Sequence, residues 1–310
     1  MIHTKYEMPH GGILETYLQD SQITYKKYKK KPAIIICPGG AYLIHATKEG
    51  EPAAVEFMQR GFQCFVLRYS VGTDREHPET GINPNAKYPV QVLQIMEAMH
   101  LIHEHADEWQ IDGKKIFVSG FSAGGHVAAS LAVRWNDPAL LRQLYFQPKE
   151  NELKPAGAIL GYPMLCLNQD SYMKTVDQGM QEKTKLLYQT IFHTEFPNEQ
   201  QRESVNLMNY ISKDSAPVFL WNCMDDPVVF YRNAIDYVDK CRENGVYCEY
   251  HLFAQGGHGL SVNSELTVME EKEINLSVTQ WKELAAAWCR QVSRKMENES
   301  CLQENDKHRK

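Results

Sequence analysis

A serine near the middle of the chain stands in a pattern that suits nucleophilic chemistry. Residues 119–126 read Ser-Gly-Phe-Ser-Ala-Gly-Gly-His, and they contain a Gly-x-Ser-x-Gly pentapeptide centred on Ser122. The run 115–118 before it is typical of a buried strand, and apolar side chains recur at helical spacing over residues 127–135. A serine on so sharp a strand-to-helix turn requires small neighbours, and its hydroxyl stands clear of the sheet. We therefore expect Ser122 to be a nucleophile.

His258 is the candidate base that would accept the proton of Ser122. It lies in the glycine-rich segment 254–259, directly after a predicted strand that ends at Phe253. Flanking glycines let an imidazole reach a neighbouring loop without obstruction. A serine, then an acid, then a histidine is the chain order of strand–turn–helix serine sites, and it favours a base over a turn histidine exposed to water. His126, on the helix after Ser122, is expected to pack or to orient that helix.

Two adjacent aspartates compete for the role of the acid that orients the imidazole. Asp225 and Asp226 lie in the loop after the predicted strand 217–222, and either could point at His258. Only one carboxylate can take this position, and we expect the other to cap the following turn. Their spacing along the chain does not separate the two.

Backbone N–H groups aimed at the attacked carbonyl oxygen would complete such a site. The N–H of Ala123, next to the nucleophile, is one expected donor. Gly40 and Ala41 are the expected second source, because they follow the apolar run 33–37 and glycine lets the backbone approach a substrate. The alternative for this segment is a plain strand-to-loop turn.

An alternation of strands and helices must bring these segments together. The expected strands cover residues 13–18, 22–25, 33–37, 62–68, 115–118, 156–161, 217–222 and 247–253, and the expected helices 52–60, 89–109, 127–135, 231–244 and 277–292. This order predicts an α/β fold with a mostly parallel sheet and helices on both faces. Ligands of such sheets lie at the carboxyl ends of the strands. Each candidate segment directly follows a strand, so we expect all of them at one edge.

The length of 310 residues is normal for one domain of this kind. We expect a single domain over residues 1–294, with a small helical insertion at about 168–212, and a frayed polar tail at 295–310. The insertion has two interpretations, a lid over the site or an ordinary insertion packed on the core, and we favour the second. The side chains that would face the site under the first are Tyr172, Leu187, Tyr188, Ile191 and Phe192.

The composition excludes several classes of partner. Hydrophobic residues make up 43% and charged residues 23% of the chain, as in soluble globular proteins. The formal net charge of −6 gives no electrostatic reason to expect nucleic acid or an anionic membrane as a partner. Residues 1–7 lack the features of a signal peptide, and no apolar run approaches the length of a membrane span. We therefore expect a cytoplasmic protein, whose oligomeric state the sequence does not reveal.

The cysteines and histidines indicate neither a disulfide framework nor a metal site. Eight cysteines are scattered without close pairs, and three of them, Cys37, Cys64 and Cys223, fall in predicted strands. They are expected to be small buried residues in a reducing compartment. The histidines between residues 100 and 105 lack the i, i+4 pair with a flanking glutamate that zinc hydrolases use. We expect no metal and no cofactor.

Motifs spread over residues 33–290 are similar to those of one superfamily. They are Cys37–Tyr42, Glu49–Pro52, Leu67–Tyr69, Pro89, Gly120–His126, Trp221–Val229 and Gly257–Gly259. The chain resembles the α/β-hydrolases, and within them the bacterial acetyl-esterase group that includes acetylxylan esterases and feruloyl-esterase-like proteins. Two positions depart from that group: Ala41 stands where it commonly has a third glycine, and Asn222 where relatives often carry histidine. The first departure can alter the shape of the acyl site.

The resemblance implies an α/β-hydrolase fold and a serine carboxylesterase. Such an enzyme would remove short acyl groups, acetyl from acetylated sugars or oligosaccharides, through an acyl-enzyme on Ser122. In that group the acid is the third residue before the valine that matches Val229, which favours Asp226. A peptidase or formamidase of the same fold, or a hydrolase-fold binding protein without turnover, remain as alternatives because a fold does not determine a substrate.

Overall fold

The computed structural model describes residues 1–20, 30–73, 81–166 and 178–307. One eight-stranded sheet has the order β1-β2-β4-β3-β5-β6-β7-β8. Its strands are β1 (Lys5–Glu7), β2 (Ile13–Tyr17), β3 (Lys31–Cys37), β4 (Gln63–Arg68), β5 (Ile111–Phe121), β6 (Ala158–Gly161), β7 (Val218–Cys223) and β8 (Cys248–Phe253). In the sheet order from β4 to β8 all neighbours are parallel, whereas β1 pairs antiparallel with β2 and β2 pairs antiparallel with β4. The predicted mostly parallel sheet is therefore confirmed.

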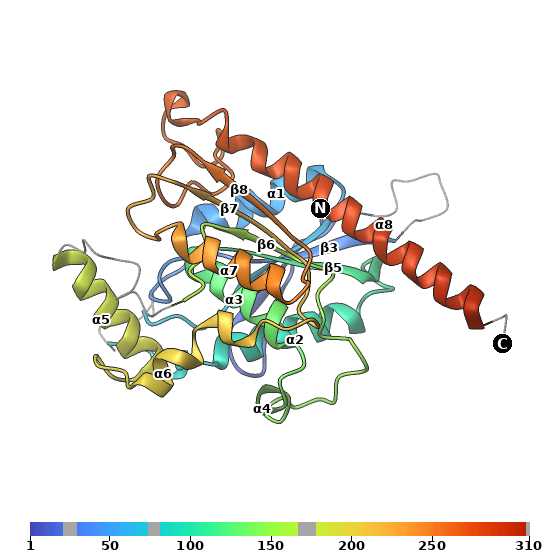
Figure 1. The fold of residues 1–310 in the computed structure, drawn as a ribbon, viewed down its shortest axis with the longest axis horizontal. Helices are drawn as coiled ribbons and strands as arrows, with labels where there is room; N and C mark the ends of the chain where they lie inside the picture. The colour runs from blue at the N-terminus through green and yellow to red at the C-terminus, as the bar shows by residue number, and fades with distance from the viewer. Residues whose placement is uncertain (21–29, 74–80, 167–177, 308–310) are drawn as a thin grey trace.

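Helices cover both faces of the sheet (Figure 1). The α-helices are α1 (Glu51–Gln59), α2 (Val90–Glu104), α3 (Ser122–Arg134), α4 (Pro138–Leu141), α5 (Gln178–Phe192), α6 (Glu199–Ser204), α7 (Arg232–Glu243) and α8 (Trp281–Lys307). Side chains of α1 and α8 share one core with Ile34 and Ile36 of β3, and side chains of α2, α3 and α7 share the other with Ile35. Because successive side chains point to opposite faces, a strand covered on both sides is apolar throughout.

The end of the chain differs from the sequence-based expectation. α8 continues to Lys307 and runs past the body of the molecule (Figure 1), so the expected frayed tail is wrong for residues 295–307. Lys115 of β5 holds this part of the helix through an ion pair of 2.6 Å to Glu297. A helix already anchored in the core propagates easily through glutamate, lysine and methionine, which are good helix formers.

Two other expectations need comment. The short edge strand β1 was not predicted, and the expected strand at residues 22–25 lies outside the described residues. Cys37, Cys64 and Cys223 are fully buried in β3, β4 and β7, as predicted.

The insertion is helical where the structure describes it, with α5, α6 and a 3-10 turn at Leu207–Tyr210. Leu187, Ile191 and Phe192 of α5 are buried in the same core as α2 and α3. Tyr172 lies outside the described residues. The single domain over residues 1–294 stays a prediction.

In the parts of the chain that the structure covers, no helix has both the length and the apolar character to cross a membrane. The cytoplasmic location stays a prediction.

A substitution at Trp288 tests how α8 packs on the sheet. This side chain is 1% exposed and packs against Phe117 and Phe219 of the sheet. Trp288→Ala is expected to lower the free energy of unfolding by about 3–5 kcal/mol, because it removes buried apolar area and leaves a cavity. Chemical denaturation measures the change. Leu276, which is 77% exposed, is the control. Leu276→Ala should change stability by less than about 0.5 kcal/mol, and equal effects of both substitutions would contradict the packing described.

Candidate active site

The turn at Ser122 is so tight that two of its positions admit only glycine. β5 ends at Phe121, α3 begins at Ser122, and the φ angle of this serine is 50°. A Cβ atom on Gly120 would lie 2.1 Å from the carbonyl oxygen of Gly124, and one on Gly124 would lie 2.0 Å from the carbonyl oxygen of Cys37. The strand–turn–helix geometry predicted from the pentapeptide is present.

The structure brings Ser122, Asp226 and His258 together. Nε2 of His258 lies 3.0 Å from Oγ of Ser122, and its Nδ1 lies 2.7 Å from Oδ2 of Asp226. Because a carboxylate accepts, Nδ1 carries the proton in this arrangement and Nε2 has a lone pair directed at the serine. The Asp226 side chain is fully buried, which strengthens its bond to the imidazole. The group can abstract a proton from the hydroxyl.

The two adjacent aspartates have different partners. Oδ1 of Asp226 accepts the N–H groups of Val228 and Val229, so this aspartate caps its own turn and also holds the imidazole. Asp225 is exposed, and its carboxylate accepts the N–H groups of Gly256 and Gly257, at 3.1 and 2.9 Å. These bonds, that from Gly257 above all, hold the pKa of Asp225 below its usual value. The expectation that the second aspartate caps the following turn is therefore wrong, because Asp225 fastens the loop that carries His258.

The loop after β3 presents free backbone donors beside Ser122. Gly40 and Ala41 have φ angles of 124° and 57°, and the carbonyl oxygen of Gly40 accepts the N–H groups of Leu43 and Ile44. Among the described residues, no hydrogen bond uses the N–H of Gly40, Ala41 or Ala123 as its donor. Gly40 and Ala41 also line the cavity in front of Ser122, whereas Ala123 is fully buried.

A cavity of about 550 Å³ opens in front of Ser122 and His258. Its apolar wall consists of Leu43, Ile44, Met164, Leu187, Val228 and Val229. Lys48 and Lys183, both exposed, also line it. α5 of the insertion therefore borders the cavity through Lys183 and Leu187, while the end of the helix packs in the core. A mostly apolar space of this size can hold an organic ligand next to the serine.

Sequence reasoning missed a buried carboxyl group behind the loop after β3. In the sequence, Glu49 stands out only as the first residue of the motif Glu49–Pro52, and the structure buries it to 2% exposure. Its Oε2 accepts the N–H of Gly39, and its Oε1 accepts the hydroxyl of Tyr162, both at 2.7 Å. Burial raises the pKa of Glu49, and the hydrogen bonds from Tyr162 and Gly39 oppose this. No local pattern announces such a residue, since its partners come from distant segments.

His126 is fully buried and ties α3 to two other segments, which agrees with the packing role expected for it. Its Nε2 donates to the carbonyl oxygen of Val205 at 2.8 Å, so its Nδ1 accepts the hydroxyl of Tyr42 at 2.7 Å. Burial lowers the pKa of His126 to about 4, and the ring is therefore neutral at pH 7. Tyr42, with φ of 60°, is thus held at the end of the loop that follows β3.

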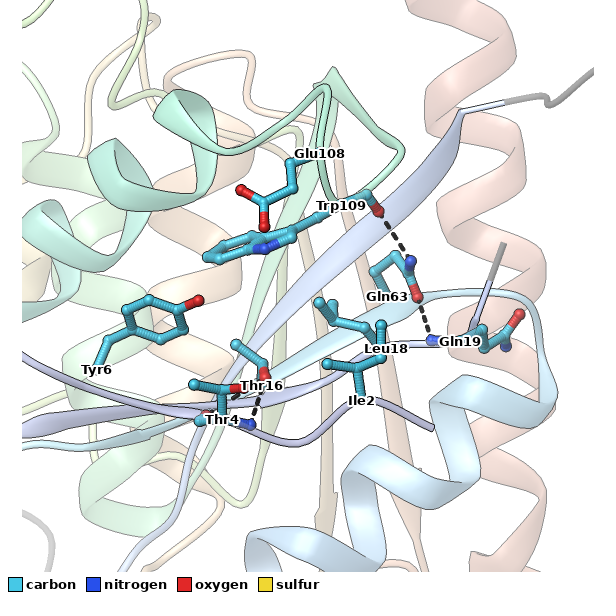
Figure 2. Close-up of a pocket in the computed structure, with 9 residues that line it drawn as sticks. All are labelled: Ile2, Thr4, Tyr6, Thr16, Leu18, Gln19, Gln63, Glu108 and Trp109. Atoms are coloured by element: carbon cyan, nitrogen blue, oxygen red, sulfur yellow. Dashed lines mark hydrogen bonds between the residues drawn. The ribbon is translucent and has the colours of Figure 1, made fainter. Parts of the chain in front are cut away.

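A second, smaller pocket of about 180 Å³ lies at the opposite end of the sheet, where β4 and β5 begin (Figure 2). The side chain of Gln63 donates to the carbonyl oxygen of Trp109 and accepts the N–H of Gln19, each at 2.9 Å. The N–H of Thr4 likewise bonds to Oγ1 of Thr16. These polar groups join the first strands to the sheet and are already paired.

Within the described residues, no group of three or more His, Cys, Asp or Glu side chains is placed to hold a metal ion.

The sequence profile of the BD-FAE family matches residues 20–240, which include Ser122 and Asp226. The chain belongs to the BD-FAE family. The match ends before His258, so the histidine is placed by the structure and not by the profile.

Named relatives of this BD-FAE member are larger proteins. The chain is 29% identical over 262 residues to endo-1,4-beta-xylanase B of Butyrivibrio fibrisolvens, covering 84% of this chain and 36% of the relative. It is 22% identical over 236 residues to an acetylxylan esterase of Xylanibacter ruminicola, covering 73% of this chain and 40% of the relative. The chain therefore spans well under half of the length of either relative.

A solved structure covers nearly the whole BD-FAE chain. The acetyl ester-xyloside bifunctional hydrolase from Caldicellulosiruptor lactoaceticus has a TM-score of 0.69 at 26% identity, over 92% of this chain and 89% of that one. Together with the strand order, this likeness confirms the α/β-hydrolase fold that the resemblance implied. Relatives with esterase names support an esterase-type hydrolase.

Because His126 of this BD-FAE member is buried in its neutral form, we expect the protein to lose stability in acid. Below about pH 6.5 the unfolded chain takes up a proton at His126, whereas the folded protein does not until the pH nears 4. Stability therefore falls as the pH falls through this window, and this group contributes about 3 kcal/mol of the loss. Denaturant unfolding at pH 7 and pH 4.5 measures it.

His126→Gln should reduce the difference in stability between the two pH values, even though it lowers stability at pH 7. Exposed His3 provides the control, and His3→Gln should leave the difference unchanged. An identical pH dependence in His126→Gln and the wild type would show that His126 is not buried in its neutral form.

Proposed function

We propose that the protein is a serine carboxylesterase that removes short acyl groups, acetyl above all, from sugars or oligosaccharides. One observation carries the proposal. His258 lies within hydrogen-bond distance of both Ser122, at 3.0 Å, and the buried carboxylate of Asp226, at 2.7 Å. A nucleophile bonded to a base that is itself oriented by an acid is the arrangement that acyl transfer requires.

In the proposed reaction, Oγ of Ser122 attacks the ester carbonyl carbon while its proton passes to Nε2 of His258. The tetrahedral intermediate collapses when Nε2 gives this proton to the leaving alcohol, so the ester C–O bond breaks and an acyl-enzyme remains. Water then attacks the acyl-enzyme with the same imidazole as base, and the free acid departs. Asp226 holds Nδ1 in the donating tautomer and stabilises the imidazolium in both steps.

Three backbone donors are proposed to stabilise the negative charge that develops on the carbonyl oxygen. They are the N–H groups of Gly40, Ala41 and Ala123, and the proposal is supported by their lack of other acceptors among the described residues. Donors that are already oriented stabilise the transition state without reorganisation, which is usually a large contribution to catalysis.

The substrate class is proposed from the cavity and from the relatives. The cavity of about 550 Å³ beside Ser122 is bordered largely by apolar side chains, which suits an uncharged acyl group. Two matched proteins are named an acetylxylan esterase and an acetyl ester-xyloside hydrolase, and a third a xylanase. The cavity is compatible with an ester substrate, and the names of these proteins support acetyl esters of sugars or oligosaccharides as its class.

Ser122→Ala is expected to lower kcat on p-nitrophenyl acetate by about 10⁴- to 10⁶-fold, because no other group can form the acyl-enzyme. The measurement is run beside butyryl and octanoyl esters, acetylated xylo-oligosaccharides and a matched p-nitroanilide. Activity that survives the substitution would refute the assignment of the nucleophile. Faster turnover of the anilide than of the esters would instead favour a peptidase or formamidase. A wild type that neither turns over esters nor reacts with a fluorophosphonate would favour a binding protein.

The adjacent aspartates offer a matched pair for the role of the acid. In Asp226→Asn, the amide oxygen must face the N–H groups of Val228 and Val229, so the amide NH₂ faces the imidazole. The imidazole then adopts the wrong tautomer, with Nε2–H directed at Ser122, and kcat should fall by about 10⁴-fold.

Asp225→Asn is the control, since it loses only one of two hydrogen bonds to the loop of His258. Its kcat should stay within about tenfold of the wild type, in line with a neutral hydrogen bond worth about 1 kcal/mol. A larger loss in Asp225→Asn than in Asp226→Asn would reverse the assignment.

A further inference from the structure

The carboxyl group of Glu49 links the loop after β3 to the loop that carries His258. The proposed chemistry requires these two loops to keep a fixed relative position. Glu49 ends the 3-10 turn at Thr47–Glu49, just before α1. It accepts the N–H of Gly39, which precedes the proposed donors Gly40 and Ala41. A Cβ atom on Gly39 would lie 2.7 Å from Oε2 of Glu49 and 3.0 Å from Cβ of Ser122, so the carboxyl and the nucleophile both pack against Gly39.

Tyr162 extends this contact to the loop that carries His258. Its hydroxyl donates to Glu49 at 2.7 Å and accepts the N–H of Ser261 at 2.8 Å. The Tyr162 ring packs edge-on against the His258 ring, with 4.8 Å between centroids and an interplanar angle of 62°. Ser261 also donates through its hydroxyl to the carbonyl oxygen of Lys48, at 2.5 Å. The segment at Lys48–Glu49 and the histidine loop are thus joined twice.

Stability alone does not account for a carboxyl group in this place. Glu49 has no ion pair with a lysine or arginine among the described residues, and it is almost fully buried. Burying a carboxyl without a cation is costly, and well-packed apolar residues of the same size are often at least as stable. The loops it contacts contain residues with left-handed backbone, Gly40, Ala41 and Ser261 (φ 124°, 57° and 54°). Such conformations persist only where the surroundings hold them.

We propose that Glu49 and Tyr162 are positioning residues. They hold the loop after β3, which contains the proposed donors Gly40 and Ala41, and the loop of His258 in one fixed geometry. The inference rests on the proposed esterase function. The bond from Gly39 to Glu49 sets the orientation of the following peptide groups, so that the N–H groups of Gly40 and Ala41 face the cavity. The bond from Tyr162 passes the same constraint to the imidazole. Glu49 also borders the cavity, and the role proposed for it and for Tyr162 is exerted through the two loops and not on the reacting atoms.

The first test is a pair of substitutions at Glu49. Glu49→Ala removes both acceptors and should lower kcat by about 10- to 100-fold while KM changes by less than about threefold, because the geometry matters most in the transition state. In Glu49→Gln the amide oxygen can accept the N–H of Gly39 while the NH₂ donates to the oxygen of Tyr162. This variant should recover most of kcat, staying within about fivefold of the wild type, since oriented contacts rather than charge are proposed to matter.

Tyr162→Phe tests the second half of the bridge with the loss of a single hydroxyl. It should lower kcat by about tenfold, and the double variant Glu49→Ala/Tyr162→Phe should lose little more than Glu49→Ala alone. Independent, multiplying effects of the two substitutions would mean that they do not act through one bridge, and would overturn the proposal.

A boronic acid inhibitor separates positioning from general loss of structure. It forms a tetrahedral adduct on a catalytic serine, so its Ki should rise by the same factor by which kcat/KM falls in Glu49→Ala. Glu97, a fully buried carboxylate that contacts His10 away from the site, is the matched control. Glu97→Ala should lower Tm and leave both kcat and Ki within about threefold of the wild type, as expected for a substitution outside the site.

The outcomes separate this inference from the proposed function. A wild type without ester turnover, or activity that survives in Ser122→Ala, refutes the esterase proposal itself. With an active wild type and an inactive Ser122→Ala, kcat and Ki unchanged in both Glu49→Ala and Tyr162→Phe refute only the positioning role. A fall in kcat that Glu49→Gln does not recover, or that leaves Ki unchanged, also refutes it.

Discussion

The close contact between the turn at Ser122 and the end of β3 is the constraint on which the site depends. Gly124 lies so near the carbonyl oxygen of Cys37 that no side chain fits between them. β3 and β5 are neighbours in the sheet, and their register pairs Cys37 with Gly120. The nucleophile and the loop after β3 therefore leave the sheet side by side. The remaining strands follow in the order β6, β7, β8, which carries the loops of Asp226 and His258 to the same edge.

Polar contacts between loops, more than apolar packing, set the geometry at this edge. Asp226 uses one oxygen for its own turn and the other for His258. The exposed carboxylate of Asp225 accepts a backbone N–H of the loop that carries His258, and Glu49 is linked to the same loop through Tyr162. The bonds of Asp226 and Glu49 are buried in a low-dielectric setting, where hydrogen bonds are strong and directional, so they can hold loops that contain left-handed residues.

Features determined by neighbouring residues were predicted from the sequence, whereas features determined by distant residues were not. The central strands were placed to within a few residues, because strands buried on both faces produce continuous apolar runs. β1 was missed because three residues carry too little pattern. The helical end of α8 was mistaken for a tail, since its charged residues look the same in a solvated helix and in a disordered segment. The contacts of Glu49 were not predicted because its partners Gly39 and Tyr162 lie 10 and 113 residues away.

The sequence by itself determined the turn at Ser122, the chain order of serine, acid and histidine, and the α/β alternation that brings them to one edge. These depend on steric demands and periodicities that neighbouring residues express directly. The resemblance favoured Asp226 over Asp225, and the tertiary structure decided which atoms meet, Oδ2 of Asp226 and Nδ1 of His258, 32 residues further along the chain. It also decided that Asp225 and Glu49 support the loops around the site. The roles of Asp225 and Glu49 depend on the directions of side chains across separate loops, which spacing along the chain does not reveal.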